Sequence, residues 1–192
     1  MPSDFENFPR LLPRRFAART LPGLLFATAS RQPERRFLRF LEPPAAVGDP
    51  PAPPRTLSRG AFAAGVGRAA HFLRSAGVGP GVRVLLLAEN SPEWQMVALG
   101  TQLLRAEPAA IFSSLGAETV AGIARRVAPR VIFVSSAAQW EKLAPVAPQL
   151  VDAGLVAVIS GDRLTLTSAP GGLAVVALAA VTGDEAPGLA PG

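Results

Sequence analysis

GVGPGVRVLLLAENSPEW, residues 77–94, contains the three signals that decide the fold: a turn, an apolar run and the start of a helix. The glycines at its beginning and Pro80 favour a sharp turn. The run from Val82 to Ala88 does not alternate apolar with polar residues, which is typical of a strand covered by helices on both faces. Ser91 can accept a hydrogen bond from an unpaired amide, and Pro92 suits the first helical position. The stretch therefore predicts one strand and helix of an α/β fold.

The same alternation of helix and strand continues in both directions along the chain. The expected helices are 21–32, 57–75, 92–104, a helix from Ser113 or Ser114 to 127, and 137–143. The expected strands are 37–41, 82–87, 109–112, 131–134 and 155–159, with 164–167 and 174–178 as strands or a short pair. Such alternation indicates right-handed crossovers between parallel strands. The predicted fold class is therefore α/β, with a mostly parallel sheet flanked by helices.

Three segments carry a resemblance to a known family. They are TLPGLLFATASRQPERRFLRF at 20–40, TLSRGAFAAGVGRAAHFLRSAGVGPGVRV at 56–84 and PAAIFSSLGAETVAGIARRVAPRVIFVSSAAQWEKL at 108–143. In order and spacing the chain resembles the N-terminal portion of the AMP-binding, adenylate-forming superfamily, most closely its long-chain fatty-acyl-CoA synthetase branch. The resemblance implies the N-terminal segment of an ATP-dependent ligase that converts a fatty acid to an acyl-adenylate and then to acyl-CoA. Fatty acid, ATP and CoA are the implied partners, and ATP, Mg²⁺ and CoA the implied cofactors, of the complete enzyme.

The sequence also departs from that family. Its phosphate loop, rich in Ser, Thr and Gly and ending in Pro-Lys-Gly, has no counterpart here. Arg59 and Ala61 stand where the family usually has tyrosine and glutamate, Val82 replaces an acidic residue, and Arg105-Ala106-Glu107 replaces a common glycine pair. We therefore expect a catalytically incomplete chain, with no catalytic, cofactor-binding or metal-binding residues and no cofactor of its own.

The sequence predicts three regions along the chain. We expect an N-terminal arm at 1–19, a partial AMP-binding synthetase domain at 20–181 with a proline-rich loop at 42–55, and a flexible tail at 182–192. Four arginines of the arm suggest a transit peptide, but Asp4 and Glu6 break the acid-poor pattern of such peptides. A solvated helix face is the preferred interpretation of the arm.

Composition excludes several classes of protein. No apolar stretch approaches the roughly 20 residues that span a bilayer, and the absence of cysteine excludes disulfides and thiolate metal sites. The net charge of +5 comes almost entirely from arginine, since Lys142 is the only lysine. Those arginines are spread over several elements instead of forming a basic patch with aromatic residues. We expect a cytoplasmic protein with no transmembrane segment and no nucleic-acid partner.

Short motifs give weaker signals. Residues 65–70, GVGRAA, fit the dinucleotide pattern G-x-G-x-x-A, but they fall inside a predicted helix, so close helix packing is the better explanation. His71, the only histidine, has no catalytic serine motif beside it and is expected on a helix surface. Trp94 and Trp140 are expected to anchor their helices. Asn90 and Ser91 follow a strand, where α/β sheets bind ligands, but helix capping explains them and no site is assigned there.

A second hypothesis remains open beside the ligase segment. An α/β module derived from this fold could be non-catalytic and bind a protein or nucleotide through an exposed sheet edge, because unpaired strand edges invite association.

Overall fold

The computed structural model describes residues 20–41, 50, 53–161, 170 and 172–182. The arm at 1–19, most of the proline-rich loop, the predicted strand 164–167 and the tail from 183 lie outside the described residues. Thr182, which the sequence assigns to the tail, is the last residue of a helix.

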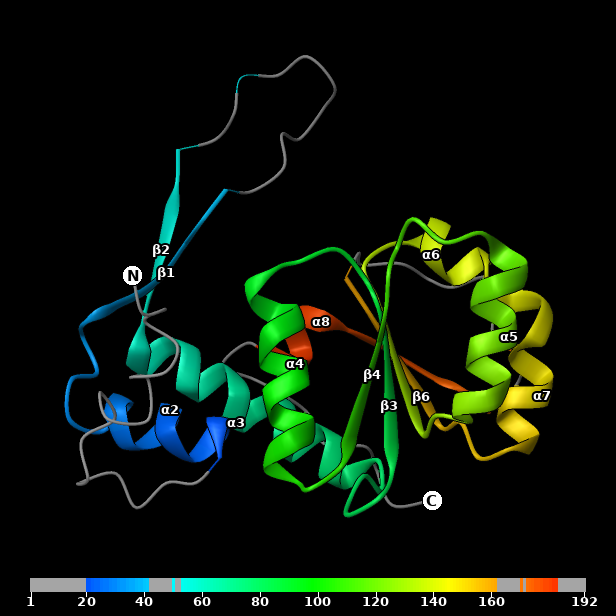
Figure 1. Ribbon diagram of the computed structural model, residues 1–192, viewed down its shortest axis with the longest axis horizontal. Coiled ribbons are helices and arrows are strands. Elements are labelled where there is room, and N and C mark those ends of the chain that lie inside the picture. The colour runs from blue at the N-terminus through cyan, green and yellow to red at the C-terminus, as the bar shows by residue number, and fades with distance from the viewer. Residues whose placement is uncertain (1–19, 42–49, 51–52, 162–169, 171, 183–192) are drawn as a thin grey trace, which may run out of the picture.

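A five-stranded parallel sheet forms the centre of the molecule (Figure 1). Its strands are β3 (Arg83–Leu87), β4 (Glu107–Ile111), β5 (Val131–Val134), β6 (Ala157–Ser160) and β7 (Ala174–Ala177). They lie in the order β4-β3-β5-β6-β7, and every pair is parallel. The predicted fold class is therefore confirmed.

Helices cover both faces of this sheet, as the unbroken apolar strands predict (Figure 1). One face packs against α3 (Arg59–Ser75), α4 (Pro92–Leu103) and α8 (Leu178–Thr182). The other packs against α5 (Ala117–Val127), α6 (Ala137–Glu141), the short 3₁₀ helix η1 (Ala144–Val146) and α7 (Ala147–Asp152). Successive side chains of β3 point to opposite faces of the sheet. Leu86 packs in the core on the α3 and α4 side, and Leu85 packs in the core on the α5 and α7 side.

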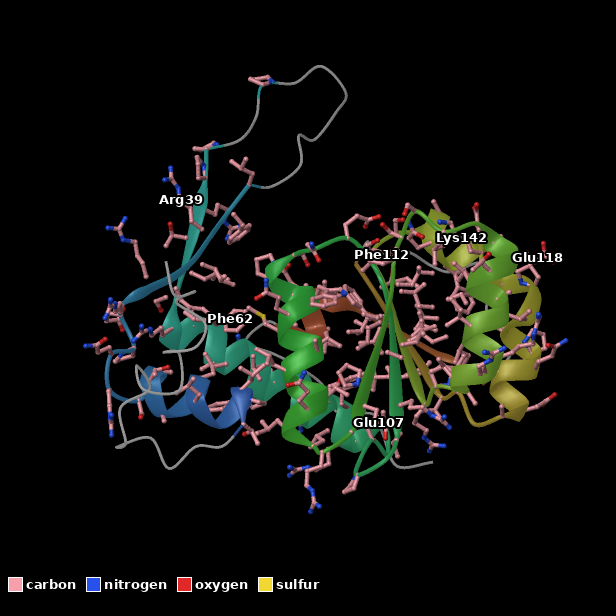
Figure 2. The ribbon with its side chains drawn as sticks, in the orientation of Figure 1. Arg39, Phe62, Glu107, Phe112, Glu118 and Lys142 are labelled. Carbon is pink, nitrogen blue, oxygen red and sulfur yellow. The ribbon has the colours of Figure 1, made fainter. Side chains whose placement is uncertain are left out.

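A third core lies beside α3, under an N-terminal helix and hairpin. Helix α2 (Leu21–Ala29) precedes β1 (Arg36–Phe40), which pairs antiparallel with β2 (Arg55–Ser58). The fully buried Phe62 lies at the base of this hairpin (Figure 2), where the centroid of its ring is 5.1 Å from that of Phe37. The sequence did not predict β2, because its four residues follow a run of prolines.

Two predicted helix starts are wrong. Helix α3 begins at Arg59 and not at residue 57, because Leu57 and Ser58 pair with β1, and the Ser58 hydroxyl then accepts a hydrogen bond from the Ala61 amide at 3.2 Å. Helix α5 begins at Ala117, after Gly116, with no side-chain cap from Ser113 or Ser114. Residues 112–116 instead turn back, with the Leu115 amide 3.2 Å from the Phe112 carbonyl oxygen.

The C-terminal third differs most from the sequence prediction. Helices α7 and α8 and the 3₁₀ helix η1 were not predicted. Pro145 and Pro148 resemble helix breakers in sequence, but they occupy the first turns of η1 and α7, where a missing amide costs least. Strand β6 lies slightly later than the predicted 155–159, and β7 adds a parallel strand within the predicted 174–178.

Glycines allow α3 and α4 to pack closely. A Cβ atom on Gly65 would collide with the Met96 side chain, and one on Gly100 would lie 3.0 Å from the Ala70 backbone nitrogen. A Cβ on Gly67 would meet nothing within 4 Å. The packing explanation of the 65–70 motif therefore holds for Gly65 and is not needed for Gly67.

Candidate functional site at the carboxyl edge of the sheet

The strand order creates a switch point between β3 and β5. The chain runs from β3 to its neighbour β4 on one side, and then crosses to β5 on the other side of β3. In open α/β sheets, ligands bind outside the carboxyl ends of the strands at such a point. The residues that follow β3 and β5, Glu89 and Ser135, therefore mark the position to search.

Polar side chains converge at this edge. The Gln139 amide donates to the Glu89 carboxylate, with an Nε2–Oε1 distance of 3.2 Å. The buried oxygens Ser135 Oγ, Ser160 Oγ and Gln139 Oε1 have no hydrogen-bond partner among the described residues. Such orphaned polar atoms at the end of a parallel sheet are what a binding site needs, since each can still be satisfied by water or a ligand.

Close approach of the backbone holds the ends of β5 and β6 together. The Gly161 amide donates to the Val134 carbonyl oxygen at 2.8 Å, and a Cβ on Gly161 would collide with the Ser135 backbone. Only glycine fits at this position, so the chain that leaves β6 lies directly against the Ser135 backbone.

The charged form of Glu89 is favoured by its neighbours. The Ser135 hydroxyl is the main cause, and with the hydroxyl of Ser113 and the amide of Gln139 it lowers the pKa of Glu89 below its ordinary value of 4.5, against the opposing effect of partial burial. Ser135 Oγ lies near the Glu89 carboxylate without the geometry of a hydrogen bond. The hydrogen bond that Glu89 does accept comes from the Gln139 side-chain amide. Glu89 is therefore a carboxylate at neutral pH.

This pKa predicts a pH-dependent stability. A carboxyl group whose pKa is lowered by folding stabilises the protein above its unfolded pKa, and that contribution is lost as pH falls through the folded pKa. We expect wild type to exceed Glu89→Gln in urea stability at neutral pH, with a gap that shrinks as pH falls below 4.5. Glu118→Gln, a change of an exposed residue on α5, serves as the control. A gap that stays constant with pH would contradict the assignment.

Lys142 fixes the loop beside this cluster. Its Nζ donates to the carbonyl oxygens of Ser113, at 2.6 Å, and Leu115, at 3.0 Å. Figure 2 shows Lys142 and Phe112 near the carboxyl ends of the strands, with Glu107 at the opposite end of β4. The loop presents Phe112 to solvent, with 81% of its surface exposed.

Removal of the Lys142 ammonium should loosen this loop. Because each charged donor contributes about 1.5–3 kcal/mol when buried, and Lys142 is only half-buried, we expect Lys142→Met to lose about 1–2 kcal/mol of stability. Amide hydrogen exchange at residues 113–116 should rise more than elsewhere. Glu141→Ala changes the exposed neighbouring residue and should alter neither quantity. Unchanged exchange in Lys142→Met would show that the loop does not depend on the lysine.

A cavity of about 310 Å³ opens on the other side of Glu89. It lies between the ends of β3 and β4 and the first turn of α4, and its lining includes Glu89, Asn90, Trp94, Phe112 and Ser113. One carboxylate and two aromatic rings suit a ligand that donates hydrogen bonds and has a flat apolar face. A phosphate is a poor fit, because this lining has no cation.

The described residues do not fit a triphosphate either. Lys142, the only lysine, is committed to two carbonyl oxygens. The glycines of the 65–70 motif lie inside α3, and Gly77, Gly79 and Gly81 precede β3, at the opposite end of the strand from the switch point. Within the described part of the chain, no three His, Asp or Glu side chains are grouped as a metal site would require. We therefore derive no step through ATP or Mg²⁺ from this chain.

The residues singled out in the sequence have structural positions. His71 is exposed on α3. Ser91 caps α4 by accepting from the Trp94 amide at 3.0 Å, which confirms the capping interpretation. Trp140, 2% exposed, anchors α6 in the core, and Trp94 packs half-buried against the core on the other face.

No role at this site was predicted for Glu89, Gln139 or Lys142. Glu89 follows the end of β3, Gln139 lies in α6 and Lys142 is the C-cap of α6. That they are neighbours depends on the strand order, which the sequence pattern does not specify. The expectation of no catalytic residue in the chain stays a prediction.

A parallel sheet of this order, with a polar switch-point edge, defines a doubly wound α/β protein. The sequence matches the AMP-binding enzyme family over residues 25–179. Because this match covers well over half of the chain, the protein belongs to that family.

Several solved structures share this fold. The acetoacetyl-CoA synthetase from Streptomyces lividans matches with a TM-score of 0.65 and 22% identity, over 86% of this chain and 25% of that one. The A domain of carboxylic acid reductase from Segniliparus rugosus, solved with AMP and a co-purified carboxylic acid, has a TM-score of 0.69 and 15% identity, over 93% and 32%. A Rhodopseudomonas palustris protein designated a long-chain-fatty-acid CoA ligase has a TM-score of 0.66 and 22% identity, over 90% and 38%.

The chain is much shorter than the proteins it resembles. The chain spans between a quarter and two fifths of these three structures. No curated protein matches the chain in sequence. None of the helices in the described ranges is long and apolar enough to cross a bilayer.

Proposed function

We propose that this chain is the N-terminal segment of an AMP-dependent acyl-CoA synthetase and is catalytically incomplete on its own. The complete enzyme would activate a fatty acid with ATP and Mg²⁺, through an acyl-adenylate, and transfer the acyl group to CoA in the cytoplasm. The observation that carries the proposal is the family match over residues 25–179, on a sheet whose described residues include no cradle for a triphosphate. The acyl-CoA synthetase and ligase among the similar structures support the choice of reaction.

ATP–pyrophosphate exchange with palmitate tests this proposal. We expect no exchange from the purified 192-residue chain, with an active acyl-CoA synthetase as the positive control. Exchange catalysed by the chain alone would contradict its incompleteness. The reading frame continued past Gly192 tests the assignment to a ligase. Exchange by the longer product would support the assignment. Sequence unrelated to the family after Gly192 would contradict it.

The structure weighs against the alternative of association through the β4 edge. The Glu107 amide donates inward to the Val82 carbonyl oxygen at 2.8 Å, so the next residue, Pro108, has its nitrogen on the outer side, where an added strand would need a donor. Glu107 also places an exposed charge there. The other outer strand, β7, has no further strand beside it among the described residues. Size-exclusion chromatography with light scattering separates the two hypotheses: a purpose-built interaction module should be monodisperse, whereas an isolated segment of a larger enzyme should aggregate.

A further inference from the structure

The turn between α2 and β1 brings two arginines together at the start of α3. Arg35 Nη1 donates to Gln32 Oε1 at 3.1 Å, and Arg59 Nη1 donates to the same oxygen at 3.0 Å. The two guanidinium groups therefore lie within two hydrogen-bond lengths of each other. Figure 1 shows this junction of α2, β1 and α3 at the end of the molecule away from the parallel sheet. It is thus separate from the polar cluster at the switch point.

Main-chain contacts place both arginines. The Arg59 amide donates to the Arg35 carbonyl oxygen at 2.9 Å, and the Gly60 amide donates to the Pro33 carbonyl oxygen at 2.8 Å. A Cβ on Gly60 would lie 3.1 Å from the Pro33 Cβ, so the turn packs tightly against the first turn of α3. The two side chains therefore start from a backbone that is fixed on both sides.

The positive charge at this junction is not neutralised. Among the described residues no carboxylate forms an ion pair with Arg35 or Arg59, and the oxygen that they share belongs to a neutral amide. Glu34, the neighbour of Arg35, is exposed and pairs with neither. Arg59 is also the first residue of α3, where the helix dipole is positive and a cation is unfavourable.

One donor at the junction is buried and unused. Arg59 Nε has no hydrogen-bond partner among the described residues, although water does not reach it. Three unfavourable features thus coincide: two like charges side by side, a cation at a helix start and a buried donor without an acceptor. A single anion bound between the two guanidinium groups would relieve all three.

We propose that Arg35 and Arg59 bind a phosphate ion, which acts as a structural anion and joins the turn to the start of α3. Guanidinium donors match the oxygens of an oxyanion, and the hydrogen bonds are strengthened by charge. A tetrahedral phosphate has enough oxygens to accept from both arginines and from the buried Nε. The inference goes beyond the proposed ligase activity, because no step of that reaction is assigned to this junction.

Titration of the full chain with inorganic phosphate, followed by the NMR signals of its backbone amides, tests the site. Chloride keeps the ionic strength constant. We expect saturable shifts at residues 32–36 and 58–61, with a Kd on the order of 1 mM, as two exposed charge-assisted contacts allow. Arg35→Gln and Arg59→Gln should each weaken binding about tenfold. Arg74→Gln removes the same charge from an exposed position of α3 and should leave the affinity unchanged.

A gain of charge gives an independent test. Gln32→Glu places a carboxylate at the oxygen that the two arginines share, so it should abolish phosphate binding and raise the urea stability of the protein in phosphate-free buffer. Gln102→Glu makes the same change at an exposed position of α4 and should alter neither quantity. If Arg59→Gln does not fold, Arg35→Gln and Gln32→Glu still decide the matter.

Three results would overturn the proposal. They are shifts that do not saturate, wild-type affinity in Arg35→Gln or Gln32→Glu, and displacement of phosphate by an equal concentration of ATP with Mg²⁺. We expect no such displacement, because Mg²⁺ already coordinates the phosphates of ATP. Absence of phosphate binding would leave the proposed ligase assignment untouched, since that assignment is measured by pyrophosphate exchange.

Discussion

Gly100→Leu should destabilise the protein by about 3 kcal/mol or prevent it from folding, because the contact between α3 and α4 has no room for a side chain. A Cβ at Gly100 would lie 3.0 Å from the Ala70 backbone nitrogen and 3.2 Å from the Val66 carbonyl oxygen. These are backbone atoms, so the strain cannot be relieved by a change of rotamer. Urea unfolding followed by circular dichroism measures the loss.

A smaller change and a matched control keep this test quantitative. Gly100→Ala adds only the Cβ and should cost about 1–2 kcal/mol, which remains measurable if the leucine variant does not fold. Gly67→Ala, in α3, should stabilise the protein by about 0.5–1 kcal/mol, because its Cβ meets nothing and alanine favours the helix. The two alanine variants should therefore have opposite signs. Stabilisation by both would show that α3 and α4 are not in close contact.

Trp140→Ala should cost about 3–5 kcal/mol, the range for removing a large aromatic side chain from a core. Trp140 is 2% exposed and packs in the cluster that joins α5, α6 and α7 to the sheet. Thermal or urea unfolding checks the value. Trp94→Ala is the comparison, since Trp94 is half-buried and should cost distinctly less. Equal losses would mean that burial does not distinguish the two tryptophans.

The sheet could be predicted from sequence because its signals are local. Leu85 to Leu87 and Val131 to Val134 are unbroken apolar runs bounded by turns, and no other element accommodates them well. The start of α4 was equally clear, since Ser91 and Pro92 act on their own helix. Each of these assignments depends on residues that lie next to one another in the chain.

The start of α5 and the candidate site could not be predicted, because they depend on contacts between residues that are distant in the sequence. Ser113 and Ser114 are good capping residues, but Lys142, almost thirty positions later, draws the Ser113 carbonyl oxygen into another turn. Glu89 and Gln139 form a site only because β5 lies beside β3, an order that periodicity does not specify.

The central claim is that the described residues supply part of the scaffold of an AMP-binding enzyme and do not include the groups that hold a triphosphate. Calorimetric titration of the purified chain with ATP and Mg²⁺ tests it most directly. We expect no saturable heat of binding from a protein that is folded by circular dichroism. Tight binding of one ATP per chain would contradict the account.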